Sequence, residues 1–256
     1  MDHKYGKLFV GAASLALAAT SFGATAVVAD SHEESEGYVL AMTNTNVGNG
    51  WREEMRCSIL AEALKSGQVS EVLEFHQTAD AAEQGASILN FIEAGADAII
   101  VNPALASALD EPIQAATDAG IAVISVDQAV TAPTAYSITN DHVEYARLGA
   151  DWLFETLGGE GDVYYMRGIA GAPADDDRDA GFQAALANYP DINIVAQDHT
   201  GWQFPEGKKL MLEKLTGGVE PDGVWTSGID FVIPEAYAES EVPFVPVVGA
   251  DTAEFI

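Results

Sequence analysis

Apolar and polar positions along the chain form short apolar runs separated by longer amphipathic stretches. The first four runs of strand length are residues 38–42, 72–75, 98–101 and 122–126. Stretches with helical spacing lie between them, at about residues 50–65, 80–93 and 107–119. This β-α-β-α alternation, with strands that are apolar throughout, predicts a parallel sheet covered by helices on both faces.

The same alternation starts again at residue 135. Strands are predicted at residues 135–138, 163–166, 192–197, 223–227 and 244–249, with helices at about 174–188 and 205–215 and a shorter helical piece before the last strand. The best-marked helix begins after Asp141, which can cap it, and ends at Gly158 and Gly159. Helical spacing predicts that its apolar side consists of Val143, Ala146, Ala150, Leu153 and Leu157.

Two such series in tandem predict two α/β lobes, each with a doubly wound parallel sheet. We expect residues 37–139 to form the N-terminal lobe and residues 140–256 to form the C-terminal lobe. Asp251 and Thr252 follow the last predicted strand and have the pattern of a strand-to-helix junction. The sequence stops shortly after this junction, so we expect the C-terminal part of the architecture to lie beyond Ile256.

The first 29 residues have the composition of a secretory signal peptide. Lys4 and Lys7 form a short basic region, residues 8–29 are apolar and rich in Ala and Gly, and small residues precede a cleavage site after Ala29. No cysteine stands near that site, so we expect an exported protein that is not lipid-anchored. Residues 30–36 form an acidic tail, and no later segment is long and apolar enough to span a bilayer.

The chain is strongly acidic, with 40 acidic and 11 basic residues and a formal net charge of −29. This charge argues against nucleic acid and anionic membranes as partners. It agrees equally with a saline habitat and with solubility alone. The 48% of hydrophobic residues suffice for a sizeable core. Cys57 is the single cysteine, so no intrachain disulfide is possible, and we expect it to be buried between Met55 and Ile59.

Polar and aromatic residues follow nearly every predicted strand. Ligands of open α/β sheets bind beyond the carboxyl ends of the strands, so these positions are candidate contacts. Carboxylates and amides exchange hydrogen bonds with hydroxyl groups, arginine provides a planar fork of donors, and indole rings offer a flat face to a sugar ring. The set therefore predicts a site for a polyhydroxylated ligand. Its members are Thr43, Asn49, Trp51, Arg52, Asn102, Asp127, Asn140, Arg178, Trp202, Ser227, Asp230 and Asp251.

Common catalytic motifs are absent from the sequence. It contains no GxSxG, no HExxH, no GxGxxG after the first strand and no GxxxxGK[ST]. The stretch GIAGAPADDDRDAGF does contain DDxxD, at Asp175, Asp176 and Asp179, a pattern that can hold Mg²⁺ for diphosphate chemistry. We interpret Asp175, Asp176 and Asp177 instead as the start of a helix, where carboxylates cap free N–H groups and favour the helix dipole. Arg178 is then the functional residue, with a neighbouring aspartate orienting its guanidinium, and we expect no enzyme activity, cofactor or metal ion.

The leader, the two tandem lobes and the segments VNP, VISVD, TND, GIAG…RDAGF and VVGAD, in this order, carry a family resemblance. The chain resembles the type I periplasmic sugar-binding proteins of ABC importers, and is most similar to their ribose-binding branch, over residues 37–256. The resemblance implies two lobes that are joined by a hinge and close over one sugar. It implies that Asp127 and Arg178 grip sugar hydroxyls and that Trp202 stacks on the sugar. Further contacts implied by the family pattern are Thr43, Asn49, Trp51, Asn102, Ile169 and Asp251.

The sequence departs from the ribose branch at several of these positions. Gln128 follows Asp127 where the ribose branch has Arg, Trp51-Arg52 replaces two Phe in the first-strand loop, and TSGID replaces an Asn-Asp pair. Ala250 stands where an aromatic residue is common. These departures suggest a ligand that differs from ribose in size or substituents, with Arg52 as an added contact.

The function that the resemblance implies is that of a monomeric periplasmic substrate-binding protein of an ABC transporter. Such a protein binds a monosaccharide or related polyol and delivers it to a permease in the inner membrane. One alternative is an exported receptor for a non-nutrient furanosyl signal or for a ligand sensed by a chemoreceptor. Remoter alternatives are a Mg²⁺-dependent diphosphate enzyme that uses DDxxD, and a transcription regulator, which would need a DNA-binding segment where the leader stands. The residue types alone do not distinguish one sugar or polyol from another.

Overall fold

The computed structural model describes residues 37–250, and within them two parallel sheets alternate with helices. The predicted signal peptide, the acidic tail and Asp251 lie outside the described residues. Between residues 37 and 250, no helix has both the length and the apolar character that a membrane span requires.

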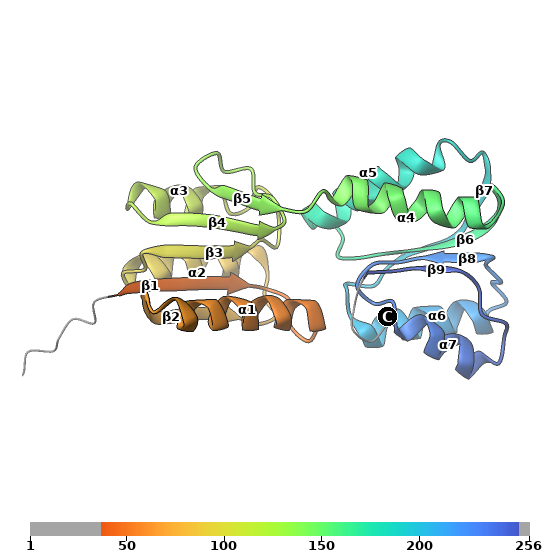
Figure 1. Cartoon of the computed structure of the whole chain (residues 1–256), viewed down its shortest axis with the longest axis horizontal. Helices are drawn as coiled ribbons and strands as arrows, with labels where there is room; N and C mark the ends of the chain where they lie inside the picture. The colour runs from red at the N-terminus through yellow and green to blue at the C-terminus, as the bar shows by residue number, and fades with distance from the viewer. Residues whose placement is uncertain (1–36, 251–256) are drawn as a thin grey trace, which may run out of the picture. The chain divides into compact units, whose positions relative to one another are not determined.

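The first sheet has five strands in the order β2-β1-β3-β4-β5, all paired in parallel (Figure 1). Because β1 lies between β2 and β3, the chain changes direction across the sheet at this point, as doubly wound sheets do. Its strands are β1 (Tyr38–Asn44), β2 (Val69–His76), β3 (Ala98–Asn102), β4 (Ala122–Asp127) and β5 (Tyr136–Thr139). The intervening helices are α1 (Gly50–Ser66), α2 (Ala81–Glu93) and α3 (Asp110–Asp118).

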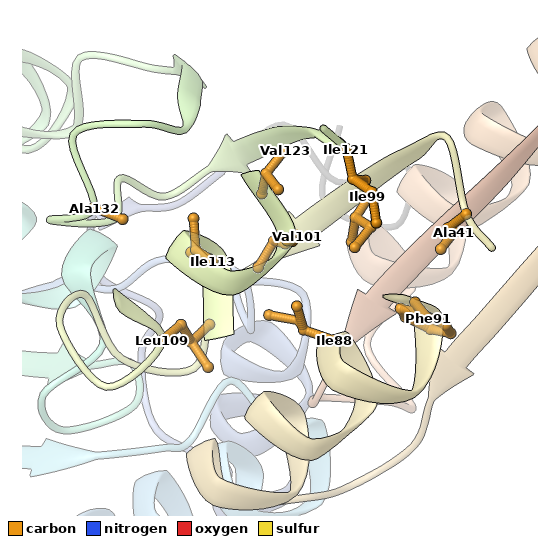
Figure 2. Packing of buried hydrophobic residues seen from close by; sticks show 12 residues of the cluster. Ala41, Ile88, Phe91, Ile99, Val101, Leu109, Ile113, Ile121, Val123 and Ala132 are labelled. Atoms are coloured by element: carbon orange, nitrogen blue, oxygen red, sulfur yellow. The ribbon is translucent and has the colours of Figure 1, made fainter. Parts of the chain in front are cut away.

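One face of the first sheet holds the main core of this part of the chain. Ile88 and Phe91 of α2 and Ile113 of α3 pack against Ile99 and Val101 of β3 (Figure 2). The strand residues that alternate with these point to the other face, which carries α1. That face is only half-buried, as the exposure of Leu40, Ile100 and Ile124 shows.

The second sheet has four parallel strands in the order β7-β6-β8-β9 (Figure 1). Its strands are β6 (Glu160–Arg167), β7 (Asp191–His199), β8 (Gly223–Trp225) and β9 (Val247–Val248). Its helices are α4 (His142–Thr156), α5 (Pro173–Leu186), α6 (Phe204–Thr216) and α7 (Val232–Ser240).

The central strand β6 is buried on both faces. Val163 and Tyr165 pack with α4 and α5, and Tyr164 and Met166 pack with α6 and α7. The Tyr165 ring stacks on Phe182 of α5, with centroids 3.8 Å apart and planes 4° from parallel. This alternation explains why β6 reads as a continuous apolar run.

The predicted fold class, doubly wound parallel α/β sheets, is confirmed, and every predicted strand and helix is found with ends shifted by a few residues. The strand β9 is shorter than predicted. Pro243 and Pro246 precede it, and proline has no N–H to donate to a sheet.

Two side-chain predictions are wrong. Cys57 is exposed, because α1 turns the side with Arg52 and Ala63 inward and Cys57 lies roughly on the opposite side of the helix. Val143 is 41% exposed, whereas Ala146, Ala150 and Leu153 of the same predicted apolar side are fully buried. At this end α4 touches α5 through its backbone: a Cβ added at Gly181 would lie 2.0 Å from the carbonyl oxygen of Val143.

Candidate functional site

A cavity of about 320 Å³ lies where strands of both sheets end. Its volume is within the range of small-molecule sites. The last residue of β4 and the segments that follow β1, β5, β7, β8 and β9 all contribute to its lining, as does α5. Seven residues predicted from the strand ends line it: Asn49, Trp51, Arg52, Asp127, Asn140, Arg178 and Trp202.

Arg52 projects from the first turn of α1 and is only 5% exposed. Its Nη1 donates to Asn44 Oδ1 at 2.6 Å and to Asn102 Oδ1. The guanidinium carbon lies 5.8 Å from the ring centroid of Trp51 and 5.9 Å from that of Trp202. Burial lowers the pKa of Arg52 to about 10, an effect that Asp127 opposes and Arg178 reinforces. The side chain still carries its positive charge at neutral pH.

Asp127 ends β4 and places a half-buried carboxylate on the cavity. His142 Nε2 lies 2.8 Å from the Asp127 carbonyl oxygen and 3.4 Å from its Oδ1. Burial raises the pKa of Asp127, but the hydrogen bond from His142 and the positive charges of Arg52 and Arg178 outweigh it and lower the pKa below 3.8. An ionised carboxylate at this point can accept hydrogen bonds from ligand hydroxyls.

Arg178 comes from α5 and reaches the cavity against two aromatic rings. Its guanidinium carbon lies 5.0 Å from the Tyr145 ring centroid and 5.6 Å from that of Trp202, and its Nη1 donates to Ser227 Oγ at 3.1 Å. The buried Nε of Arg178 and the buried Nε1 of Trp202 have no hydrogen-bond partner among residues 37–250. Buried donors in native proteins are nearly always paired, so these two are candidates for pairing with a ligand.

Asn49 joins the two halves of the cavity wall. It caps α1 by accepting from Arg52 N, and its Nδ2 donates to the carbonyl oxygen of Trp202 at 3.1 Å. A second contact of this kind runs from Gln203 Nε2 to Asn46 Oδ1 at 2.7 Å. Segments that follow strands of different sheets are therefore in direct hydrogen-bonded contact.

Two residues of the cavity have left-handed backbone. Among residues 37–250, the non-glycine residues with positive φ are Asp127 (65°), Trp202 (53°) and Glu241 (55°), and the first two line the cavity. Such conformations are uncommon for residues with a Cβ and gather at functional sites. The Trp202 ring also needs Gly168, because a Cβ there would lie 2.1 Å from the ring.

Several predicted contact residues lie behind the cavity wall and do not line it. Thr43 is buried and accepts from Ser87 Oγ at 3.1 Å. Ile169 packs under Trp202, and Asn102 holds Arg52. The fully buried Asp230 lies next to the wall residues Gly228 and Ala250; burial raises its pKa to about 6, against the lowering effect of their backbone N–H groups. Asp251 falls outside the described residues.

Four side chains that line the cavity were not predicted from the positions just after the strands: Glu54, His142, Tyr145 and Phe204. All four lie in the first turn or two of the helix that follows a strand. A helix that starts at the carboxyl end of a strand directs its first turn at the same edge of the sheet. If the candidate positions after each strand had included the first turn of the following helix, the sequence would have predicted His142 and Tyr145 after Asn140.

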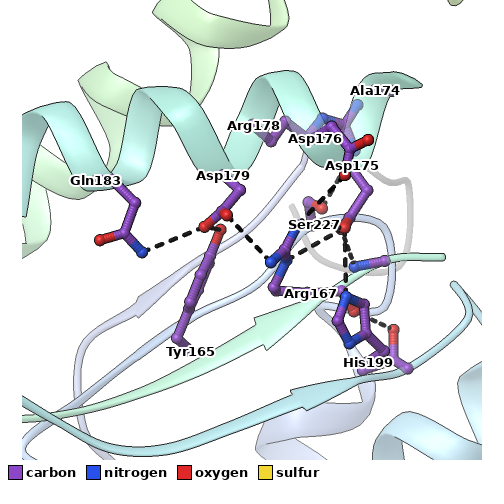
Figure 3. Close-up of polar contacts among 12 residues, drawn as sticks. Tyr165, Arg167, Ala174, Asp175, Asp176, Arg178, Asp179, Gln183, His199 and Ser227 are labelled. Atoms are coloured by element: carbon purple, nitrogen blue, oxygen red, sulfur yellow. Dashed lines mark hydrogen bonds and ion pairs between the residues drawn. The ribbon is translucent and has the colours of Figure 1, made fainter. Parts of the chain in front are cut away.

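The acids of DDxxD surround a different arginine from the one expected (Figure 3). Arg167, at the end of β6, is 2.8 Å from Asp175 Oδ2, 3.1 Å from Asp179 Oδ2 and 3.7 Å from Asp176 Oδ1. Asp175 is 3% exposed, and its Oδ1 also accepts from Gly168 N at 2.6 Å. The expectation that one of these acids orients Arg178 is wrong, because packing of α5 on β6 directs them to Arg167.

The DDxxD acids therefore attach α5 to the sheet. The helix starts at Pro173, and its N-cap Ala172 has no side-chain hydrogen bond, so these carboxylates do not cap the helix as expected. Asp175 and Asp176 do lie in its first turn, where their charge favours the helix dipole. No cluster of His, Cys, Asp and Glu suited to a metal ion occurs within residues 37–250.

Comparison with known proteins places this architecture in a family. The chain is 30% identical over 179 residues to the xylitol-binding protein of Mycolicibacterium smegmatis, covering 68% of this chain and 51%, about half, of that protein. It is 27% identical to the galactofuranose-binding protein YtfQ of Escherichia coli, covering 93% of this chain and 73% of YtfQ. Both relatives are named as binding proteins and not as enzymes, in agreement with the sequence-based expectation.

A solved structure gives the same result. The ABC transporter solute-binding protein of Thermobispora bispora superposes with a TM-score of 0.76 at 30% identity, over 82% of this chain and 67% of that one. A family model described as a periplasmic binding protein domain matches residues 40–254. The chain therefore belongs to the type I periplasmic binding protein family that its sequence resembles.

Proposed function

We propose that the protein is the receptor of an ABC importer and that it binds a monosaccharide or a related polyol in the cavity at the strand ends. The observation that carries this proposal is the composition of the cavity wall. Two carboxylates, two guanidinium groups and several aromatic rings converge there from both sheets. This combination recognises hydroxyl groups along one side of a ligand and the C–H face along the other.

Each polar group has a role that its surroundings support. Asp127, ionised and held by His142, accepts hydrogen bonds from adjacent hydroxyls. Arg178 donates from its unpartnered Nε, and Trp202 donates from Nε1. Arg52 is held by Asn44 and Asn102 in a fixed position, so its remaining donors meet the ligand with little loss of side-chain entropy.

The two sheets belong to two lobes, residues 37–139 and 140–256, and ligand binding favours their closed arrangement. A ligand that touches Asp127 on one lobe and Arg178 on the other gains contacts only when both half-sites are together, so it shifts the population to the closed state. The contact between Asn49 and the Trp202 carbonyl supports this arrangement from outside the ligand. The permease then senses closure of a monomeric receptor exported to the periplasm by its leader.

The relatives bear on the class of ligand. The xylitol-binding protein and the galactofuranose-binding protein are named for a linear polyol and for a five-membered sugar ring. Both compounds present several adjacent hydroxyls on a small carbon frame, which suits a cavity of about 320 Å³. We propose a ligand of this size, with hydroxyls that reach Asp127 and Arg178 at the same time.

A thermal-shift screen of the purified protein tests this function. Xylitol, D-galactose, L-arabinose, D-ribose and myo-inositol are added singly, and the ligand should raise the melting temperature. At one hundred times its Kd, a ligand specific for the folded state adds about 2.7 kcal/mol to the free energy of unfolding. The Arg178→Ala variant serves as the control and should show no shift. If no sugar or polyol shifts the wild type but Mg²⁺ with a diphosphate does, the receptor function is rejected.

A further inference from the structure

Gln128 is a buried polar residue that the ligand cavity does not use. It is 1% exposed and follows Asp127 directly. Because Asp127 has φ of 65°, the chain turns sharply here: Asp127 lines the cavity, whereas Gln128 is enclosed behind its wall. Gln128 N donates to Val126 O at 2.7 Å, and Gln128 O accepts from Ser125 Oγ at 2.5 Å, so the turn itself is braced.

The Gln128 carboxamide connects elements of the two sheets. Its Nε2 donates to Asn102 Oδ1 at 2.9 Å and to Pro103 O at 3.2 Å, both at the end of β3. Its Oε1 accepts from the backbone N of Ala174 at 3.1 Å, in the first turn of α5. All three contacts are buried, where a lost partner leaves an unsatisfied polar group.

Both ends of this connection lead to the arginines of the cavity. Asn102 Oδ1 accepts from Gln128 and also from Arg52. Ala174 stands one helical turn before Arg178 on α5. We infer that Gln128 is a positioning residue that couples Arg52 to Arg178, so that the two guanidinium groups reach the ligand in a set separation. This inference rests on the proposed function.

Only an amide side chain at position 128 can donate to the oxygens at the end of β3 and also accept from the N–H at the start of α5. The Asn102 and Pro103 oxygens need a donor, and the Ala174 N–H needs an acceptor. Leucine provides neither group. Glutamate keeps the acceptor for Ala174 and loses the donor for Asn102, so it breaks one half of the connection.

Gln84 provides a matched control. It is fully buried, its Nε2 donates to Asn102 O at 2.8 Å, and its Oε1 accepts from Ala104 N at 2.8 Å. The partners lie at the end of β3 and two residues beyond it, so this carboxamide binds backbone groups beside one sheet only. Gln84→Leu and Gln128→Leu each leave a backbone N–H and a backbone carbonyl without a partner, so we expect comparable losses of melting temperature.

Binding is measured by calorimetry with xylitol and with D-galactose on the wild type, Gln128→Leu, Gln128→Glu and Gln84→Leu. We expect Gln128→Leu to weaken binding about tenfold, Gln128→Glu to be intermediate, and Gln84→Leu to bind within about twofold of the wild type. Equal weakening by Gln84→Leu and Gln128→Leu would show a merely structural role. Unchanged binding by Gln128→Leu would also overturn the inference.

A ligand-free measurement separates this inference from the proposed function. Amide hydrogen exchange at Ala174 and the NMR signal of Arg178 Nε–H are recorded for the same proteins without sugar. Gln128→Leu should speed exchange at Ala174 and shift the Arg178 signal, and Gln84→Leu should change neither. If the thermal-shift screen rejects the proposed function but Gln128→Leu gives these changes, the coupling stands while the function fails. Unchanged Ala174 and Arg178 signals in Gln128→Leu would refute the coupling.

Discussion

At the scale of single residues, the basic side chains divide into two groups. Within residues 37–250, every Lys and Arg except Arg52 and Arg178 forms an ion pair with a carboxylate. These two lie on the cavity. Among the described residues, Arg52 and Arg178 hydrogen-bond to amide and hydroxyl groups, and the acid whose charge acts on both of them is Asp127 of the same cavity. Their donors remain available to a ligand.

Arg178→Ala should therefore reduce sugar affinity about a hundredfold, because it removes charged donors that desolvated ligand groups need. Asp176→Ala should change affinity by less than about twofold. Asp176 is 63% exposed and lies 3.7 Å from Arg167, away from the cavity. Calorimetry on both variants, with the compound that gives the largest thermal shift, checks this. Equal losses in the two variants would mean that the DDxxD segment and not Arg178 carries binding.

The pH dependence of Asp230 is a second prediction at this scale. Burial raises its folded-state pKa from 3.8 to about 6, so the folded state binds the proton more tightly than the unfolded state does. The stability that this group contributes is present below pH 4 and is lost as the pH rises to about 6. Asp230→Asn does not titrate. The free energy of unfolding of this variant, minus that of the wild type, should increase by on the order of 3 kcal/mol between pH 4 and pH 7.

Urea unfolding of wild type and Asp230→Asn at pH 4, 5, 6 and 7 measures this difference. Subtracting the two curves removes the pH dependence of all other groups, and any constant effect of the substitution shows at pH 4 already. A difference that is the same at all four pH values would show that the Asp230 carboxyl titrates normally in the folded protein.

At the scale of elements, the positions of helices along the chain were predictable from the sequence, whereas the partners of their side chains were not. The start of α5 was predicted within one residue of Pro173, because the switch from strand to helical spacing is local. Which arginine the acids of α5 meet depends on how the helix packs across β6, and Arg167 is eight residues from Asp175 in sequence. Local pattern favours the nearer Arg178, so sequence reasoning assigned the wrong partner.

The contact between α4 and α5 depends on Gly181, and Gly181→Ala should destabilise the protein by at least about 3 kcal/mol. A Cβ at this position meets the Val143 carbonyl oxygen at 2.0 Å, which only separation of the two helices would relieve. Gly85, inside α2, is the control. A Cβ there lies 3.4 Å from Pro112 and 3.9 Å from Leu109, so Gly85→Ala should be neutral or slightly stabilising. Chemical denaturation of both variants decides, and similar effects would show that the α4–α5 contact tolerates a methyl group.

At the scale of the whole molecule, the two parallel sheets and a cavity at their strand ends agree with the prediction from the sequence. Continuous apolar strands alternating with amphipathic helices leave few arrangements other than doubly wound sheets, whose ligands bind at strand ends. The burial of one face of the first sheet was less well predicted. Leu40 and Ile100 on this face are as apolar as their neighbours, and yet they are only half-buried. Hydrophobic pattern shows that a face can be covered, but the degree of cover depends on elements far away in the chain.

The net charge of −29 is also a property of the whole molecule. Like charges repel more strongly in the compact state, so salt that screens them should stabilise folding. We expect the melting temperature to rise steadily as NaCl is raised from about 0.05 M to about 1 M, where the Debye length is about 3 Å. KCl should give the same curve if screening is the cause. A flat or falling melting temperature would mean that salt weakens the surface ion pairs by more than it relieves repulsion.

The arrangement of α5 has a consequence for how this receptor can change over evolutionary time. Asp175 and Asp179 hold the helix to Arg167 (Figure 3), while Arg178, between them in the same helical turn, lines the cavity. Under the proposed function, we therefore expect mutations at position 178 to alter ligand choice without breaking the ion pairs that hold the helix. On this proposal, new specificities become accessible by single substitutions, and an engineer can randomise position 178 while leaving the acids in place.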